Sequence, residues 1–238
     1  MAPSVSGVPG SSSRSAEASH ESRQGMRAGE VEPAAAGDRA GDREWLRRRL
    51  SAAGGALDAQ GWVAGDEGHE AAAPAGRTPA AVLLGLVDRP EGPQIILTQR
   101  SAHLRDHGGQ ISLPGGRLEA GESPVEAALR EADEEIGLAP GRVELLGGLH
   151  HYDTITGFRI HPVVGWIEPP VSYAPDPFEV AEVFELPLDF ALDQLNHRRD
   201  SYVRNGERRH FYVLPYQDRY IWGATAGILV NFARLLAS

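Results

Sequence analysis

One stretch of the sequence, residues 116–138, limits the possible folds more than any other. Ser123 can act as the N-cap of a helix, and a proline follows it at the favoured first helical position. Glu126 stands three residues after this cap and completes a capping box. Gly137 is a typical C-terminal stop. The pattern therefore predicts an α-helix over 124–136.

This predicted helix carries apolar residues on one side and acids on another, since an α-helix turns about 100° per residue. We expect the apolar stripe to face a core, and its members are Val125, Ala128, Leu129, Ala132 and Ile136. Glu131, Glu134 and Glu135 lie at i, i+3 and i+4 and share another face. No basic residue follows them at i+4, and only Arg130 and Arg117 are close in sequence. A hard divalent cation would relieve their repulsion; a solvated acidic face is the alternative.

The same stretch resembles the Nudix box, G-x5-E-x7-R-E-U-x-E-E-x-G-U, in which U is apolar. The fixed positions all match, and Ala132 and Leu138 fill the apolar places. The matching residues are Gly116, Glu122, Arg130, Glu131, Glu134, Glu135 and Gly137. The resemblance implies an α/β (α+β) fold of the Nudix type, an α/β/α sandwich with a mixed central sheet.

Upstream of this box, the segment 95–116 places Arg100 and Arg105 among glycines. Arginine suits polyphosphate because its planar fork donates to two oxygens at once. Gly108 and Gly109 permit close backbone approach to a ligand. The segment is either a phosphate-binding loop or a basic, flexible surface loop.

The segment is also similar to a motif of the coenzyme A pyrophosphatase branch of the Nudix superfamily, L-L-T-x-R-[SA]-x3-R-x3-G-x3-F-P-G-G. Two positions depart from it, since Ile96 and Leu113 replace a leucine and an aromatic residue. The residues in register are Leu97, Thr98, Arg100, Ser101, Arg105, Gly109, Pro114, Gly115 and Gly116. The substrate contacts that this resemblance implies are Arg100, Ser101, Arg105, Gly109, Gly115 and Gly116.

A further acidic segment, 179–188, is predicted to form a strand. Similar segments are common in Nudix hydrolases, where an acid in or before the strand can approach the metal, so Glu179 is our candidate. Glu182 and Glu185 also belong to this segment, and we interpret Glu185 as exposed charge.

Together the two resemblances imply a mechanism. Glu131, Glu134 and Glu135 would hold Mg²⁺ or Mn²⁺, and one of Glu134, Glu135 and Glu179 would be the general base. The reaction would cleave coenzyme A, or its acyl or oxidised forms, into 3′,5′-ADP and 4′-phosphopantetheine. The structural residues of the box would be Glu122, Arg130 and Gly137, with Arg130 pairing with box carboxylates.

Two alternatives to this mechanism stay open. One is a Nudix hydrolase for another nucleoside diphosphate derivative, such as ADP-ribose, or for a nucleoside triphosphate. The other is a non-catalytic Nudix-like module that binds a ligand, although such modules usually lose box carboxylates.

The chain is expected to contain a disordered tail over 1–41, a short helix and linker over 42–78, and the Nudix domain over 79–238. The expected strands are 80–87, 94–99, 143–152, 158–167 and 179–188, followed by a short helix over 188–195. Strands at 202–204 and 210–215 should turn at Asn205-Gly206. A last helix follows Thr225, and Trp222 beside it is interpreted as packing.

Composition excludes several function classes. A net charge of −10 argues against nucleic acid and anionic membranes as partners, because both need a basic footprint. The absence of cysteine excludes a thiol nucleophile and disulfides. No apolar run reaches membrane-spanning length. We therefore expect a cytoplasmic protein with a small-molecule substrate, and a homodimer is possible.

Overall fold

The computed structural model describes residues 42–52, 76–104, 108–204 and 207–237. The predicted tail over 1–41, most of the predicted linker, Arg105 and the Asn205-Gly206 turn lie outside the described residues. Within the described ranges, no helix has both the length and the apolar character needed to cross a membrane.

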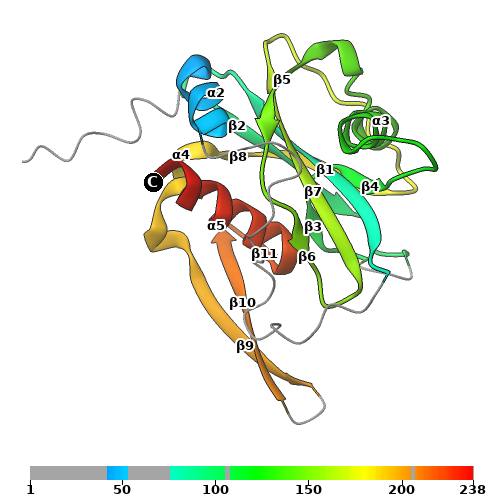
Figure 1. The fold of residues 1–238 in the computed structure, drawn as a ribbon, viewed down its shortest axis with the longest axis vertical. Helices are drawn as coiled ribbons and strands as arrows, with labels where there is room; N and C mark the ends of the chain where they lie inside the picture. The colour runs from blue at the N-terminus through cyan, green and yellow to red at the C-terminus, as the bar shows by residue number, and fades with distance from the viewer. Residues whose placement is uncertain (1–41, 53–75, 105–107, 205–206, 238) are drawn as a thin grey trace, which may run out of the picture. The chain divides into compact units, whose positions relative to one another are not determined.

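A mixed sheet of eight strands forms the centre of the described fold (Figure 1). β1 (Thr78–Val87) pairs in parallel with β7 (Phe158–Ile167) along its whole length. It pairs antiparallel with β2 (Gln94–Arg100) only near Leu86, after which β2 continues alongside β8 (Val180–Pro187). The other strands are β3 (Ile111–Ser112), β4 (Gly115–Arg117), β5 (Val143–Gly148) and β6 (Tyr152–Asp153).

A smaller antiparallel sheet and several helices complete the described chain. The sheet contains β9 (Arg198–Arg204), β10 (Glu207–Tyr216) and β11 (Arg219–Trp222), with β10 in the middle. The helices are α2 (Arg43–Ala52), α3 (Pro124–Ile136), α4 (Leu188–Leu192) and α5 (Gly223–Ala237), with the 3-10 turns η1 (Pro140–Arg142) and η2 (Gln194–Asn196).

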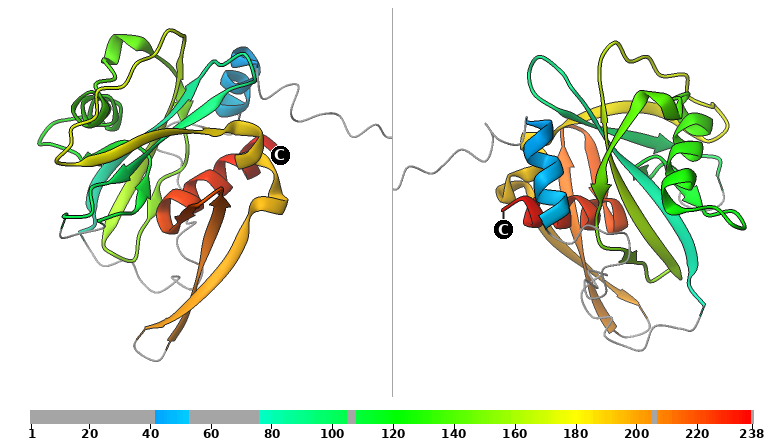
Figure 2. Two further views of the ribbon diagram at one scale, coloured as in Figure 1. Left: turned by 180° about the vertical axis from the view of Figure 1, so that it is seen from behind. Right: turned by 45° about the horizontal axis from the view of Figure 1, so that its top comes forward.

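The main sheet is covered on both faces, because β1 sends alternate apolar side chains to opposite sides. Ala81 and Leu83 pack in the cluster that contains the inner face of α3. Leu84 and Leu86 pack in the cluster that contains α2 and α5. Figure 2 shows α3 on one side of the sheet and α2 and α5 on the other. The predicted sandwich of helices around a mixed central sheet is confirmed.

Helix α3 spans the predicted residues, and both predicted ends are confirmed. Ser123 accepts from the Glu126 backbone, and the Glu126 side chain accepts from the Ser123 backbone. Gly137 ends the helix in the left-handed region at φ 70°. The cap contacts all lie within six residues of one another, which is why local sequence predicts them.

The predicted strand over 143–152 is wrong in its second half. The structure breaks it into β5 and β6, both paired with β7. Pro162 of β7 stands opposite the break and lacks the N–H that a continuous ladder needs. The register also shifts between Leu145 and Gly147.

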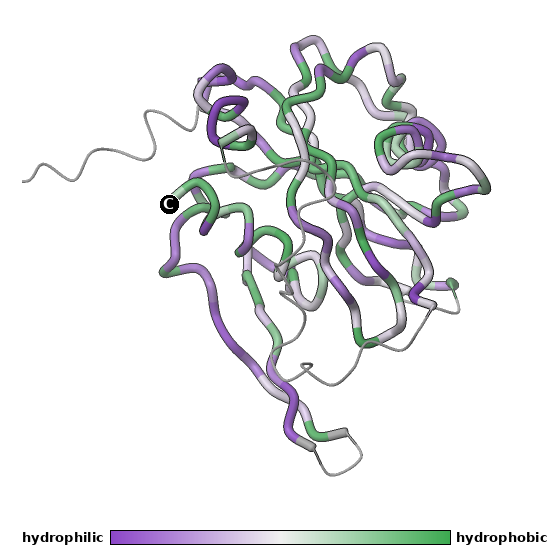
Figure 3. The backbone as a smooth tube through the Cα atoms, viewed as in Figure 1, coloured by the Kyte–Doolittle hydropathy of each residue, from purple (hydrophilic) through white to green (hydrophobic). Residues whose placement is uncertain are grey.

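Strands β9 and β10 are longer than the sequence predicts. β9 starts at Arg198, and its residues are mainly hydrophilic, as Figure 3 shows. A charged strand at a sheet edge gives little apolar periodicity to detect. The helix predicted over 188–195 also ends early, because Asp193 caps the separate turn η2.

Candidate active site

The face of α3 that packs on the sheet is rotated relative to the predicted stripe. Ala127 and Glu135 are buried there, whereas Val125 and Leu129 are only partly buried. Glu135 is 2% exposed, so a carboxylate occupies a place on the inner face of the helix. The three acids of the helix therefore do not share one solvent-facing surface.

Glu135 has two polar neighbours from other elements. Its Oε2 accepts a hydrogen bond from the Gly115 N–H at 3.2 Å, and its Oε1 lies 3.5 Å from Nη1 of Arg100. Burial raises the pKa of Glu135 to about 7, and the charges of Glu131 and Glu179 act in the same direction. The Gly115 N–H and Arg100 oppose this shift without cancelling it.

Glu131 lies beside β4, with its carboxylate against Gly116. A Cβ atom at Gly116 would overlap the Glu131 carboxylate, so any larger residue would displace that side chain. Burial raises the pKa of Glu131, and the neighbouring charges of Glu134 and Glu179 add to the effect. β4 thus brings the backbone of Gly115 and Gly116 against two carboxylates.

Arg130 joins the acids of the box. Its guanidinium donates to Glu122 at 2.8 Å, to Glu131 at 3.0 Å and to Glu134 at 2.9 Å, and also to the Arg117 carbonyl at 3.1 Å. Arg130 lies four residues before Glu134, so it supplies the compensating charge from the N-terminal side of the acids. The Glu134 side chain is 61% exposed, which separates it from Glu131 and Glu135.

Glu179 stands on a loop that is tied to the C-terminal end of α3. The Asp176 N–H donates to the Glu135 carbonyl at 2.9 Å, and the Glu179 N–H donates to the Asp176 carbonyl at 3.0 Å. The Ser101 N–H donates to the Glu179 carbonyl at 2.8 Å. The charge of Glu179 raises the pKa values of Glu131 and Glu135.

Ser101 differs from the sequence-based prediction of a substrate contact. It is 4% exposed, and its hydroxyl donates to the Pro177 carbonyl at 3.0 Å. The hydroxyl is therefore used inside the protein, where it holds the Glu179 loop. A short polar residue directly after a buried strand only weakly indicates that its hydroxyl bonds to the backbone of another loop.

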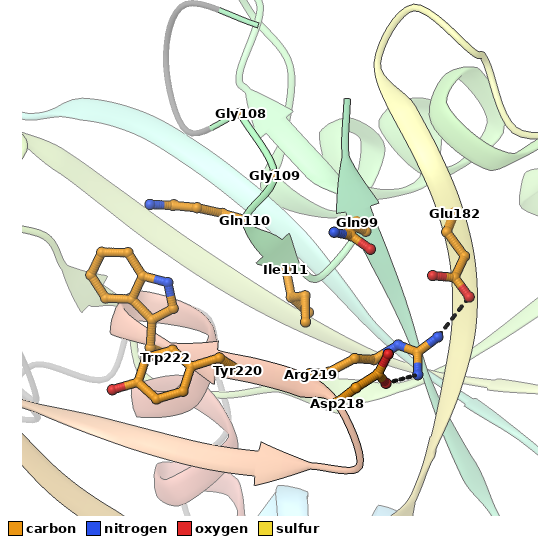
Figure 4. A pocket seen from close by; sticks show the side chains of 10 residues that line it. All are labelled: Gln99, Gly108, Gly109, Gln110, Ile111, Glu182, Asp218, Arg219, Tyr220 and Trp222. Atoms are coloured by element: carbon orange, nitrogen blue, oxygen red, sulfur yellow. Dashed lines mark hydrogen bonds and ion pairs between the residues drawn. The ribbon is translucent and has the colours of Figure 1, made fainter. Parts of the chain in front are cut away.

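The remaining predicted substrate contacts fall in different places. Arg100 and Gly115 lie at Glu135, while Arg105 lies outside the described residues. Gly109 is exposed, and its φ of 76° requires the freedom of glycine. It borders a cavity of about 510 Å³ between the end of β2 and β11 (Figure 4), which the sequence did not predict.

The prediction of exposed charge at Glu185 is wrong. The Glu185 carboxylate accepts two hydrogen bonds from Arg89, at 2.9 and 2.7 Å, and one from the Tyr173 hydroxyl at 2.7 Å. Arg89 stands in the turn after β1, 96 residues away, so sequence spacing gave no indication of the pair.

Among the described residues, no three acidic or histidine side chains converge closely enough to enclose a metal ion. The donor chemistry nevertheless fits a hard cation, because Glu131, Glu135 and Glu179 are carboxylates whose charges disfavour one another. In the observed arrangement, Arg130 compensates the charge of Glu131.

Comparison with known proteins places this chain in a family. Residues 76–205 match the NUDIX domain family model. The chain is 42% identical over 155 residues to proteins named as an uncharacterized Nudix hydrolase, NudL, from Escherichia coli O7:K1 (strain IAI39 / ExPEC) and from Escherichia coli (strain K12). Each alignment covers 65% of this chain and 80% of the relative.

Among solved structures, the fold is similar to a Nudix hydrolase from M. smegmatis, RenU, with 28% identity and a TM-score of 0.42 over 55% of this chain and 81% of that one. The family match covers more than half of this chain and includes the complete box, residues 116–138. The protein therefore belongs to the Nudix hydrolase family.

Proposed function

We propose that this Nudix hydrolase cleaves the diphosphate bond of coenzyme A or its derivatives, releasing 3′,5′-ADP and 4′-phosphopantetheine. The observation that carries the proposal is the position of Arg100. This residue belongs to the upstream motif, and its guanidinium lies 3.5 Å from the buried carboxylate of Glu135 in the box. The two motifs that the sequence suggested therefore meet in one site.

The loop between the motifs supports the same assignment. The Gly109 N–H donates to the Arg100 carbonyl at 3.0 Å, and the Arg100 N–H donates to the Gln110 carbonyl at 2.9 Å. The two ends of the loop, Arg100 and residues 109–110, are therefore hydrogen-bonded to each other. A guanidinium held at the base of such a loop can donate to two phosphate oxygens at once.

Glu131, Glu135 and Glu179, with Glu134 beside them, are the residues that would hold Mg²⁺ or Mn²⁺. The bound cation supplies charge neutralisation for the diphosphate and lowers the pKa of a water. Arg130 fixes the orientation of Glu131 by its hydrogen bond and joins Glu122 to the helix. Glu134, Glu135 and Glu179 remain the candidates for the general base.

Arg100 would then bind substrate phosphate, including the 3′-phosphate that distinguishes coenzyme A. Gly115 and Gly116 would keep the wall beside the acids free of side chains. Ser101 takes a positioning role, because its two hydrogen bonds hold the loop that carries Glu179.

The test is hydrolysis of coenzyme A and of ADP-ribose in parallel, with Mg²⁺, with Mn²⁺ and with EDTA. We expect metal-dependent release of 3′,5′-ADP from coenzyme A, faster than cleavage of ADP-ribose. Cleavage of ADP-ribose alone would contradict the coenzyme A assignment and leave the family activity intact. Binding of coenzyme A without any turnover would support a ligand-binding module instead.

A further inference from the structure

The cavity near Gly109 has no role in the chemistry proposed above. Gln99 at the end of β2 and the segment 108–111 form one side of it, and Glu182 of β8 lies on another. The turn and strand around Arg219 close the cavity from the smaller sheet (Figure 4). Both sheets therefore contribute to its walls.

Strands β2 and β8 connect this cavity to the acidic site. Gln99 directly precedes Arg100, the partner of Glu135, and the two side chains point to opposite faces of the sheet. Glu182 of β8 is the partner of Gln99 in the β2–β8 ladder. It stands three residues after Glu179, and three residues of extended chain span roughly 10 Å. The register shifts between Gln99 and Arg100, a bulge of the kind that redirects side chains beside active sites. A long ligand at the acids would reach the cavity around the end of β2, where Gly109 borders the cavity and its N–H donates to the Arg100 carbonyl at 3.0 Å.

The charges in the cavity wall do not favour phosphate. Arg219 donates to Glu182 at 2.6 Å and to Asp218 at 3.2 Å, so its charge is already compensated (Figure 4). Its guanidinium also lies over the Phe184 ring, 4.3 Å from the centroid. With two acids for this arginine, the wall has an excess of negative charge, which repels an anionic group.

The other walls are apolar or carry neutral amides. Trp222 is 36% exposed and Tyr220 49% exposed, and both border the cavity together with the side chain of Ile111. The Trp222 ring packs edge-on against Phe211, with 5.6 Å between centroids. Gln99, with Gln110 beside it, adds amide groups to this lining. Such a surface suits a neutral chain that carries both amide bonds and methyl groups.

We propose that the cavity binds the pantetheine arm of the substrate, an inference that rests on the proposed coenzyme A function. The arm extends from one side of the diphosphate, and beyond that phosphate it is neutral and contains two amides. The other side carries adenosine with a 3′-phosphate, which the acidic wall disfavours. Trp222 and Gln99 are then residues that determine specificity for the arm.

Binding of the two reaction products tests the inference without requiring turnover. Calorimetry would measure the affinity of 4′-phosphopantetheine and of 3′,5′-ADP for the full chain and for its Trp222→Ala and Gln99→Ala variants. We expect Trp222→Ala to weaken 4′-phosphopantetheine about tenfold, as loss of a well-placed aromatic contact does, and to change 3′,5′-ADP less than twofold. The KM for coenzyme A should rise by a similar factor.

Two further variants control for folding and for nonspecific effects. Trp222→Phe keeps an aromatic ring and should retain most of the affinity, and thermal melts would show that each variant is folded. Leu195→Ala removes an apolar side chain that is 88% exposed elsewhere and should leave both affinities unchanged.

The outcomes separate the two proposals. Equal loss of both products, loss of 3′,5′-ADP alone, or no change in either would overturn the pantetheine site. If the protein binds 4′-phosphopantetheine through Trp222 but does not cleave coenzyme A, the proposed function fails and the site stands. Cleavage of coenzyme A with binding independent of Trp222 would overturn only the site.

Discussion

Glu135 on α3 and Glu185 on β8 are both withdrawn from solvent, yet their surroundings differ. Glu185 receives two hydrogen bonds from Arg89 and one from Tyr173. Burial pushes the pKa of Glu185 upward, but these partners outweigh it and lower the pKa. Glu135 has one backbone donor and an arginine at 3.5 Å, and burial raises its pKa to about 7.

The comparison distinguishes a carboxylate that stabilises the fold from one held ready for a ligand. The Arg89–Glu185 pair joins the turn after β1 to β8 and is complete by itself. When Glu135 is ionised, its neighbours do not balance its charge, and a bound cation would balance it. Incompletely compensated charge in a buried position is typical of functional sites.

The largest expected effect is loss of activity in Glu135→Gln. Removing the charge should lower turnover of coenzyme A by about 10²–10³-fold, because electrostatic stabilisation at the diphosphate is lost. Steady-state kinetics at saturating Mg²⁺ would measure it, with circular dichroism as the check of folding. Glu185→Gln is the matched control, with turnover within about twofold of the wild type. Near-normal activity in Glu135→Gln would contradict the assignment.

The pH dependence of stability should separate the two glutamates next. The folded state raises the pKa of Glu135 from 4.5 to about 7, so the unfolded chain loses this proton first as the pH rises. Stability is therefore lost between about pH 4.5 and 7, and Glu135→Gln should remove that loss, a gain on the order of 3 kcal/mol at pH 8.

Urea unfolding in EDTA at pH 4.5 and pH 8 would measure this difference. We expect the wild type and Glu135→Gln to be closer in stability at pH 4.5 than at pH 8. A variant that is less stable than the wild type at pH 8 would show that Glu135 is fully compensated in the folded protein.

Removing Glu185 should have the opposite effect on stability. Glu185→Ala leaves Arg89 and the Tyr173 hydroxyl without their partner and should cost about 1–2 kcal/mol at neutral pH. Urea unfolding at pH 7 would detect the loss, with Glu182→Ala as the control on the same strand, since that side chain is 45% exposed. An unchanged midpoint in Glu185→Ala would remove the distinction between the two acids.

The smallest effect concerns the partner of Glu135. Arg100→Ala should reduce kcat/KM for coenzyme A about three- to tenfold more than for dephospho-coenzyme A, because a charge-assisted contact to the 3′-phosphate is lost. The ratio of the two kcat/KM values is the measurement. Equal losses on both substrates would mean that Arg100 acts only through Glu135 and the diphosphate.

The local parts of this protein were predictable from sequence. The caps at Ser123 and Gly137 determine the ends of α3, and they depend on contacts within a few residues. The strand over 158–167 was also predicted with its observed bounds, because apolar and polar residues alternate at its start and the apolar residues of 162–167 follow. The family resemblance located the box, and the family match and the complete box agree with it.

The surroundings of the individual acids were not predictable. Helical spacing grouped Glu134 with Glu135, but packing on the sheet buries Glu135 and leaves Glu134 exposed. Ser101 was assigned to the substrate, and only the position of the Pro177 carbonyl shows that its hydroxyl is used within the protein.

By itself the sequence determined the helix, its caps, the order of the box carboxylates and the family to which the chain belongs. These depend on neighbours within one or two helical turns and on a fixed spacing. Only the tertiary structure decided which carboxylate is buried, which arginine lies beside it and where the cavity at Trp222 forms. Those properties arise when β2, β8 and β11 come together. The residues that meet there are separated by tens of residues in the sequence, and no local pattern predicts which of them will approach one another.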